Sequence, residues 1–186
     1  MRILLAGLAG ALAMFVWTAI AHMATPLGQV GFHQIPNESA VLHTMNDSIG
    51  TQGGLYFFPW VDLSDPKAME KSAALEKTGP SGMLLYRGPG QGMDSDMTPM
   101  LIKEFLKQLG QALIAAWIVS MIAAGFVMRA GVVAAIGVSA SIATNVSYWN
   151  WYGFPLDFTM AAIVIEVVGA IAAGIAIAAV LPRKTV

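Results

Sequence analysis

The chain has 186 residues, of which 56% are hydrophobic and 11% charged, and its mean hydropathy is +0.66. A soluble domain has roughly 25% charged residues, so this composition indicates a membrane protein. The absence of cysteine excludes disulfides, thiolate metal sites and cysteine nucleophiles, and a net charge of −1 without a basic run argues against a nucleic-acid partner.

Four segments are long and apolar enough to cross a hydrocarbon core, which needs about 20 helical residues. The predicted fold is a membrane all-α bundle of four transmembrane helices, with a small α+β extracytoplasmic insertion between spans 1 and 2. The predicted spans are Ile3–Met23, Leu109–Met128, Ala130–Trp149 and Phe158–Leu181. The corresponding regions are 1–24 for helix 1, 25–98 for the insertion, 99–128 for an amphipathic lead-in and helix 2, 130–149 for helix 3 and 157–182 for helix 4.

The first span carries Ala19-Ile20-Ala21, which has the small-x-small pattern of a signal-peptidase site. Its apolar run is longer than the roughly 7 to 15 residues of a signal-peptide core. We therefore expect an uncleaved signal anchor.

Basic residues near the span ends predict the orientation. Arg2, Arg129, Arg183 and Lys184 all fall on one side of a four-span chain, so we expect both termini to be cytoplasmic. Residues 25–108 are then periplasmic or extracellular. Lys103 and Lys107 oppose this orientation, but long loops translocate largely regardless of their charge.

The insertion has its own pattern of helix and strand signals. A helix is expected from Glu38 to about Ser48 with Gly50 as its stop, and a second helix opens at Ser64-Asp65-Pro66 and closes at Thr78-Gly79-Pro80. Strands are expected at Gly54–Phe58 and Met83–Arg87, and a final helix begins at Thr98-Pro99. Two helices and two short strands make a small unit.

The connections between the later spans are short. Arg129 to Gly131 is expected to form the tight turn between spans 2 and 3. Asn150 to Pro155 forms the next connection, and its aromatic residues, with Tyr148 and Trp149, are typical of a membrane interface.

Small residues recur at every fourth position in the last two spans, a spacing that lets helices approach closely in lipid. The rows are Gly131, Ala135, Ser139, Ala143 and Ser147 in span 3, and Ala162, Glu166, Ala170, Gly174 and Ala178 in span 4. Glu166 shares its row with small residues, so we expect it to face a neighbouring helix and not lipid.

An ionisable residue inside a membrane segment is a candidate functional site. At the depth of Glu166, span 3 offers Ser141, Ala143, Thr144 and Asn145, and span 1 offers Trp17 and Thr18. Two interpretations follow: a protonated acid that joins helices by hydrogen bonds, or a proton or substrate site. The joint is favoured because the chain has no series of titratable groups leading from Glu166 to the cytoplasm.

Other chemistry has little support in the sequence. His22, His33 and His43 do not have the spacing of a haem or metal site, and the twelve methionines do not form a Met-His copper pattern. No catalytic motif is present, so we expect no enzyme activity, no metal and no cofactor. The one enzymatic alternative is a site in the insertion that uses His22, Glu38 or His43.

Residues 15–87 resemble a group of small bacterial inner-membrane proteins of unknown function. The resemblance rests on Phe15-Val16-Trp17, His22-Met23, Pro26-Leu27-Gly28, Pro36-Asn37-Glu38, Ala40-Val41, Gly54–Pro59, and Gly79-Pro80-Ser81-Gly82 through Tyr86. It implies an integral membrane protein with an outward α+β insertion.

The functional expectation is a non-catalytic membrane protein that serves as an accessory or stabilising subunit of a larger bacterial membrane complex. Its partners would be other membrane subunits and lipid. The alternative is a small transporter or ligand-binding membrane protein that uses Glu166.

Overall fold

The structure is a computed structural model that describes residues 1–182, so Arg183 and Lys184 of the orientation argument lie outside the described residues. The chain divides into two compact units. The bundle unit contains residues 1–32 and 96–182, and the insertion unit contains His33–Ser95. Each unit is described by itself.

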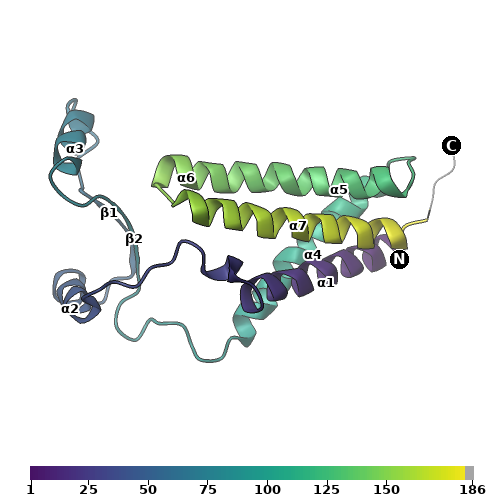
Figure 1. Cartoon of the computed structure of the whole chain (residues 1–186), viewed down its shortest axis with the longest axis horizontal. Helices are drawn as coiled ribbons and strands as arrows, with labels where there is room; N and C mark the ends of the chain where they lie inside the picture. Colours follow the sequence, from purple (N-terminus) through teal and green to yellow (C-terminus); the bar gives the residue numbers. More distant parts are fainter. Residues whose placement is uncertain (183–186) are drawn as a thin grey trace. The chain divides into compact units, whose positions relative to one another are not determined.

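The bundle unit consists of long helices (Figure 1). They are α1 (Arg2–Met23), α4 (Thr98–Ser120), α5 (Phe126–Ser141), a π-helical turn (Ile142–Val146), α6 (Ser147–Tyr152) and α7 (Leu156–Val180). Helix α5, the π turn and α6 form one continuous helix, Phe126–Tyr152. In the described residues, α1, this continuous helix and α7 are long and apolar enough to cross a membrane. The chain is therefore a multi-pass membrane protein.

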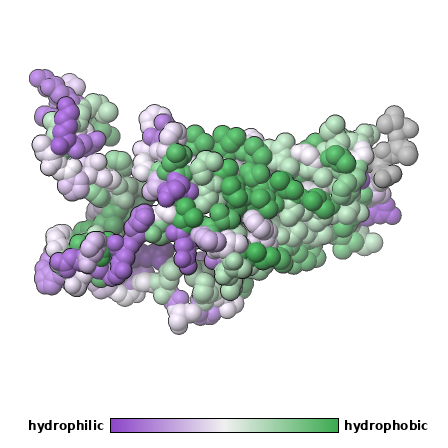
Figure 2. Space-filling view, viewed as in Figure 1, coloured by the Kyte–Doolittle hydropathy of each residue, from purple (hydrophilic) through white to green (hydrophobic). Residues whose placement is uncertain are grey.

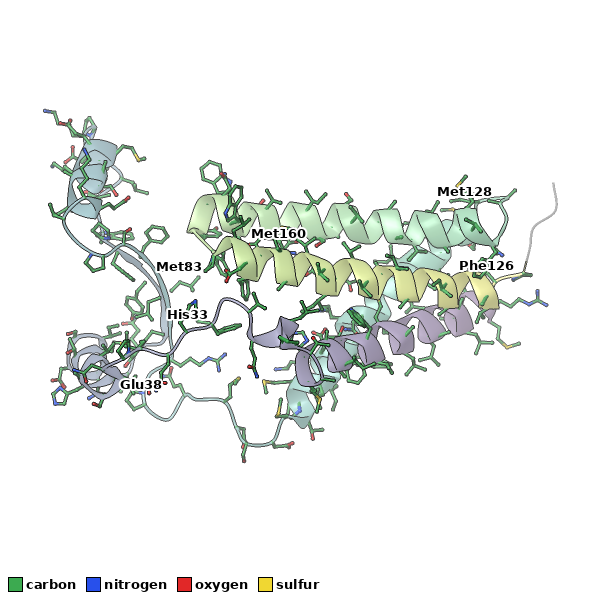
Figure 3. The ribbon with its side chains drawn as sticks, viewed as in Figure 1. His33, Glu38, Met83, Phe126, Met128 and Met160 are labelled. Atoms are coloured by element: carbon green, nitrogen blue, oxygen red, sulfur yellow. The ribbon has the colours of Figure 1, made fainter. Side chains whose placement is uncertain are left out.

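Helix α7 lies at the centre of the bundle unit, between α1 and α5, and α4 packs obliquely on α1 (Figure 1). All three of these pairs are antiparallel. Met128 near the start of α5 and Met160 near the start of α7 consequently lie at opposite ends of the bundle unit (Figure 3). Because α1 and α5 both oppose α7, they run parallel to each other.

The structure corrects the second predicted span, Leu109–Met128. Helix α4 ends at Ser120, and residues 121–125 form the connection to α5. From Leu109 to Ser120 the helix rises only about 18 Å, less than the roughly 30 Å of a hydrocarbon core. The turn expected at Arg129 is wrong as well, because Arg129 lies inside α5 and is 3% exposed. The prediction placed the turn at the charged residue Arg129, whereas the connection, residues 121–125, is apolar.

Close approach at small residues holds the helices together, as expected in lipid. A Cβ atom built on Gly137 would lie 2.1 Å from the Cβ of Ala170, and one on Gly174 would lie 2.6 Å from the carbonyl oxygen of Ala130. Gly7 and Gly10 of α1 have similarly little space beside Leu113 of α4 and Ile177 of α7 respectively. The small row of α7 is thus used for packing.

The small row expected on span 3 is not the packing row. All of its members, Gly131, Ala135, Ser139, Ala143 and Ser147, are exposed. Helix α5 and the π turn instead face α7 through Arg129, Val133, Gly137, Ser141 and Asn145. Both rows have a spacing of four, and the second one buries the two most polar residues, which would be costly in lipid.

The outer surface of the bundle unit is apolar. Figure 2 shows hydrophobic residues over most of the visible face of α5 and α7. Large side chains on this surface, such as Val127 and Ile175, are more than half exposed. Such a surface is suited to lipid, and it agrees with the membrane assignment.

An aromatic cluster lies where α6 turns into α7. Gly153 ends α6 with a left-handed backbone (φ 70°), and the ring centroids of Tyr148 and Phe154 are 5.4 Å apart. Phe158 contacts Phe154 and also Phe32, which follows the short 3-10 helix Pro26–Gln29. Residues 25–32 therefore belong to the bundle unit, and the insertion unit begins later than the predicted boundary at residue 25.

The insertion unit has the expected α+β composition: α2 (Glu38–Ile49), β1 (Gly54–Phe58), α3 (Ala68–Glu76) and β2 (Gly82–Tyr86). The strands are antiparallel, with Gly54 opposite Tyr86 and Phe58 opposite Gly82. Gly50 ends α2 with a positive φ of 72°, as its predicted role as a stop requires. The Tyr86 hydroxyl donates to the carbonyl oxygen of Gly50 at 2.8 Å, which ties the sheet to the end of α2.

Packing of α5 on α7 can be tested by replacing glycine with alanine at two positions, in separate variants. We expect Gly137→Ala to lower the free energy of unfolding by about 1–3 kcal/mol, because the new methyl group meets Ala170. The matched control is Gly131→Ala, whose methyl group has nothing within 4 Å. Unfolding in mixed detergent micelles measures both, and equal effects would contradict the packing row.

Candidate functional site

Glu166 and Asn145 are brought together by α7 and the π turn. The Asn145 amide Nδ2 donates to Glu166 Oε2 at 2.9 Å and to the Ser141 carbonyl oxygen at 3.0 Å. Ser141 is fully buried and Asn145 is 8% exposed. We refer to Ser141, Asn145 and Glu166 as the Glu166 cluster.

The π turn gives the Glu166 cluster its geometry. Ile142–Val146 are wound more widely than the α-helix on either side. Such turns are rare and often occur at functional sites. Here the turn contains Asn145, whose amide bridges the carbonyl oxygen of Ser141, on its own helix, and the carboxyl group of α7.

Glu166 itself is exposed at the surface of the bundle unit. Oε2 accepts from Asn145, while Oε1 has no hydrogen-bond partner within residues 1–182. The expectation that Glu166 faces a helix and not lipid is therefore only half correct. One carboxyl oxygen joins two helices, and the described residues leave the rest of the side chain exposed.

The other two predicted site residues lie elsewhere. Thr144 is exposed, and the described hydrogen bond of Glu166 is made by Asn145. Thr18 accepts a hydrogen bond from Gln108 Nε2 of α4 at 3.1 Å, so it belongs to the α1–α4 contact. Its neighbour Trp17 is the α1 residue that approaches the Glu166 cluster, because its Nε1 donates to the carbonyl oxygen of Ile165 at 2.8 Å.

Gln108 is a buried polar residue that the sequence reasoning missed. It is 2% exposed, and Nε2 also donates to Glu104 Oε1 at 2.8 Å. Glu104 in turn pairs with Lys107 at 2.8 Å. The Gln108 Oε1 atom is buried without a hydrogen-bond partner among the described residues. Gln108 lies in the amphipathic first part of its helix. From the sequence alone, a glutamine there cannot be distinguished from a surface residue.

The sequence did not predict a capping role for Arg129, because the expected turn lies at this residue. Its guanidinium donates to the carbonyl oxygens of Leu181 and Pro182 at 3.1 and 3.0 Å and to that of Ala178 at 3.3 Å. These carbonyls end α7 and lack helical donors. A cation at a helix C-terminus is also favoured by the helix dipole. Arg129 thus caps α7 from the first turn of α5.

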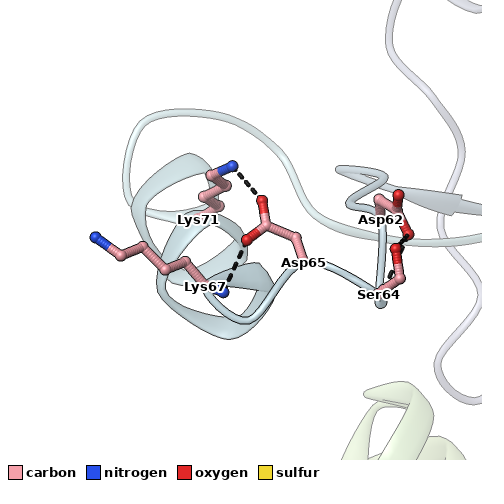
Figure 4. Close-up of polar contacts among 5 residues, drawn as sticks. All are labelled: Asp62, Ser64, Asp65, Lys67 and Lys71. Carbon is pink, nitrogen blue, oxygen red and sulfur yellow. Dashed lines mark hydrogen bonds and ion pairs between the residues drawn. The ribbon is translucent and has the colours of Figure 1, made fainter.

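The insertion unit has an open depression of its own, lined by Trp60, Val61, Asp62, Asp65, Lys71, Ala74 and Leu75. Asp62 Oδ1 accepts from both the backbone N–H and the hydroxyl group of Ser64, at 2.9 and 2.8 Å (Figure 4). These bonds lower the pKa of the Asp62 carboxyl below its ordinary value. We refer to this feature as the Trp60 depression. In the sequence, a tryptophan soon after the first predicted strand is the one feature that could have pointed to this depression.

Asp65 holds the start of α3 beside this depression. Its carboxylate pairs with Lys71, and its Oδ1 accepts from the backbone N–H of Lys67 at 2.9 Å (Figure 4). The Lys71 hydrogen bond, followed by the Lys67 N–H, lowers the pKa of Asp65 below its ordinary value. The helix expected to open at Ser64-Asp65-Pro66 therefore begins later, at Ala68, and Asp65 closes the turn that precedes it.

The histidines are divided between the two units and make local contacts. His22 Nδ1 lies 2.9 Å from the carbonyl oxygen of Thr18 on α1, and His43 Nδ1 lies 2.9 Å from Asp47 on α2. His33 and Glu38 lie in the insertion unit (Figure 3). Within residues 1–182 no group of three metal-binding side chains is present.

Comparison with protein-family models, with curated proteins and with solved structures finds no match for this chain. Its function must therefore be inferred from its own geometry.

The capping role of Arg129 predicts a large effect of its removal. Arg129→Met should lower the free energy of unfolding by about 1.5–3 kcal/mol, because a charged donor to the α7 carbonyls is lost. Arg129→Lys should recover only part of this loss, since an ammonium group cannot match the planar fork of guanidinium donors. Unfolding in mixed micelles measures both variants. Arg2→Met is the control, because Arg2 is exposed, and an equal loss there would contradict the assignment.

The start of α3 should respond to acid in a defined range. Because the pKa of Asp65 is lowered on folding, its stabilising contribution is complete above the ordinary value of 3.8 and is lost as the pH falls below it. The protection factors of the α3 amides, which correct for the pH dependence of intrinsic exchange, should therefore fall in that range in the native chain. In Asp65→Asn the same amides should exchange faster already at neutral pH. Unchanged exchange in the variant would show that the Lys71 pair does not hold α3.

Proposed function

We propose that this chain is a non-catalytic inner-membrane protein of a bacterium that serves as an accessory or stabilising subunit of a larger membrane complex. The observation that carries the proposal is the uncovered carboxyl group of Glu166. It lies within α7, an apolar helix of 25 residues, and it is exposed at the bundle surface.

A carboxyl group that contacts lipid is costly whether or not it is charged, because at least one oxygen lacks a donor. Asn145 satisfies Oε2 only. A transmembrane helix of another subunit that covers Glu166 and donates to Oε1 would remove this cost. Hydrogen bonds of this kind between membrane helices contribute about 1–2 kcal/mol.

The helix directions support a topology with four crossings. Helices α1 and α5 are parallel, so the chain has to return across the membrane between them, and α4 is the helix that returns. Its 23 residues rise about 34 Å, which exceeds the roughly 30 Å core only when the helix is counted from Thr98, so Lys103, Glu104 and Lys107 belong to the crossing segment and have to reach toward the headgroups. In this topology the predicted lead-in is part of the crossing helix.

The positions of two arginines support the orientation. Arg2 at the start of α1 and Arg129 at the start of α5 lie at the same end of the bundle unit, where α7 also ends. By the positive-inside rule we assign this end to the cytoplasm and the insertion unit to the periplasm. The resemblance of residues 15–87 to small bacterial inner-membrane proteins agrees with this assignment.

A second candidate function is a small transporter or ligand-binding membrane protein that uses Glu166. The π turn at Asn145 favours it, because π turns are frequent at functional sites. In this case the ionisation of Glu166, and not its hydrogen bonding, would be essential.

Substitution of Glu166 separates the two functions. If the carboxyl group joins subunits, Glu166→Leu should reduce co-purification of partner subunits from native membranes in mild detergent by about tenfold, which corresponds to roughly 1.4 kcal/mol. Glu166→Gln should retain the partners, because the amide still forms hydrogen bonds. Quantitative mass spectrometry after crosslinking measures the recovery.

Val164→Leu is the matched control, since Val164 is 40% exposed on the same helix and the change adds no polar group. A lone monomer for the native chain would overturn the subunit proposal. Loss of a pH-dependent transport or binding activity in Glu166→Gln, with assembly intact, would favour the transporter instead.

A further inference from the structure

The Trp60 depression combines apolar walls with a carboxylate. Trp60, Val61, Ala74 and Leu75 supply the apolar part of its lining. Trp60 lies in the loop after β1 and is 77% exposed, so much of its indole ring is free for contact. An aromatic ring this open to solvent marks a surface suited to a partner.

The charges of the depression are unequal. Asp65 and Lys71 neutralise each other. Asp62 has no cationic partner: its Oδ1 accepts two bonds from Ser64, and its Oδ2 has no hydrogen-bond partner within the described part of the chain. One carboxylate oxygen is therefore left available in a depression that also contains an exposed indole.

This combination is complementary to an organic cation. A cation over the face of an indole is attracted by the ring quadrupole, and a free carboxylate oxygen accepts a hydrogen bond from the same group. We propose that the Trp60 depression binds a lysine or arginine side chain presented by a partner protein.

The shape of the site selects a protein side chain over a small free amine. Small-molecule sites enclose most of their ligand, whereas this depression is open. Two exposed apolar residues lie close to it in the chain, Leu63 at 77% and Met69 at 78% exposure. A partner protein could place a basic side chain in the depression and apolar side chains against Leu63 and Met69.

The site goes beyond the subunit role argued from Glu166, because it lies in the other unit and depends on different residues. Its test is a binding experiment on the purified full chain in detergent micelles. The probes are acetyl-Ala-Lys-Ala-amide, its arginine analogue, and the uncharged norleucine analogue of the same length. The readout is the ¹H–¹⁵N indole signal of Trp60, identified by its absence in Trp60→Phe.

We expect the lysine and arginine peptides to shift this signal with a dissociation constant about tenfold lower than that of the norleucine peptide, since cation–π and ion-pair contacts at exposed sites are modest. Asp62→Asn should weaken lysine-peptide binding about fivefold, because the Ser64 bonds can be kept while the charge is lost. Added salt should weaken it as well.

The matched control is Asp47→Asn in α2 of the same unit, which removes an exposed carboxylate that pairs with His43 and should leave peptide binding unchanged. Equal binding of the norleucine peptide, or an unchanged constant in Asp62→Asn, would overturn the proposal. A shift of the Trp60 signal by maltotriose but not by the lysine peptide would also overturn it, and would identify the indole as a sugar platform.

Discussion

The bundle unit depends on one constraint: a polar group inside a membrane has to find its partner within protein. Four polar contacts meet this requirement at different places along the bundle. Arg129 binds the last carbonyls of α7, Asn145 binds Glu166 near the middle of that helix, and Trp17 binds the carbonyl of Ile165. The fourth contact, Gln108 with Thr18, joins α4 to α1. Three of the four involve α7, which explains why α7 is the central helix. Small residues then allow the backbones to approach, but the polar contacts determine which faces meet.

Much of the fold could be predicted from the sequence. The first and last long helices, both strands and the stop at Gly50 are where local pattern and chemistry indicated them. The end of α4 could not be predicted, because residues 121–125 are as apolar as the helix before them. The prediction of which face of α5 packs on α7 was wrong for a related reason. Two rows of α5 residues have the same spacing, and either row could pack on α7. The contacts of Arg129 and Asn145 with α7 determine which row is buried.

The candidate site was predicted in part. Spacing and depth brought Asn145 and Ser141 to the level of Glu166, and the structure places these three together. The same reasoning failed for Thr18, whose hydroxyl group is used by Gln108, a residue from a helix whose packing the sequence did not reveal. Trp60 and Asp62 were not singled out, because a single aromatic residue and a single acid in a loop have no periodicity. Sites built from one loop and one helix face become visible only when the backbone places their residues side by side.

The contact between Arg129 and the end of α7 also has a consequence for biosynthesis. The ribosome makes Arg129 long before Ala178, Leu181 and Pro182, whose carbonyl oxygens are its acceptors. When α5 first enters the membrane, its guanidinium group has to stay in the headgroup region, where water and lipid phosphates can satisfy it. It can move into the protein only after α7 has been inserted. A helix that is synthesised later therefore locks the topology of one that was inserted earlier.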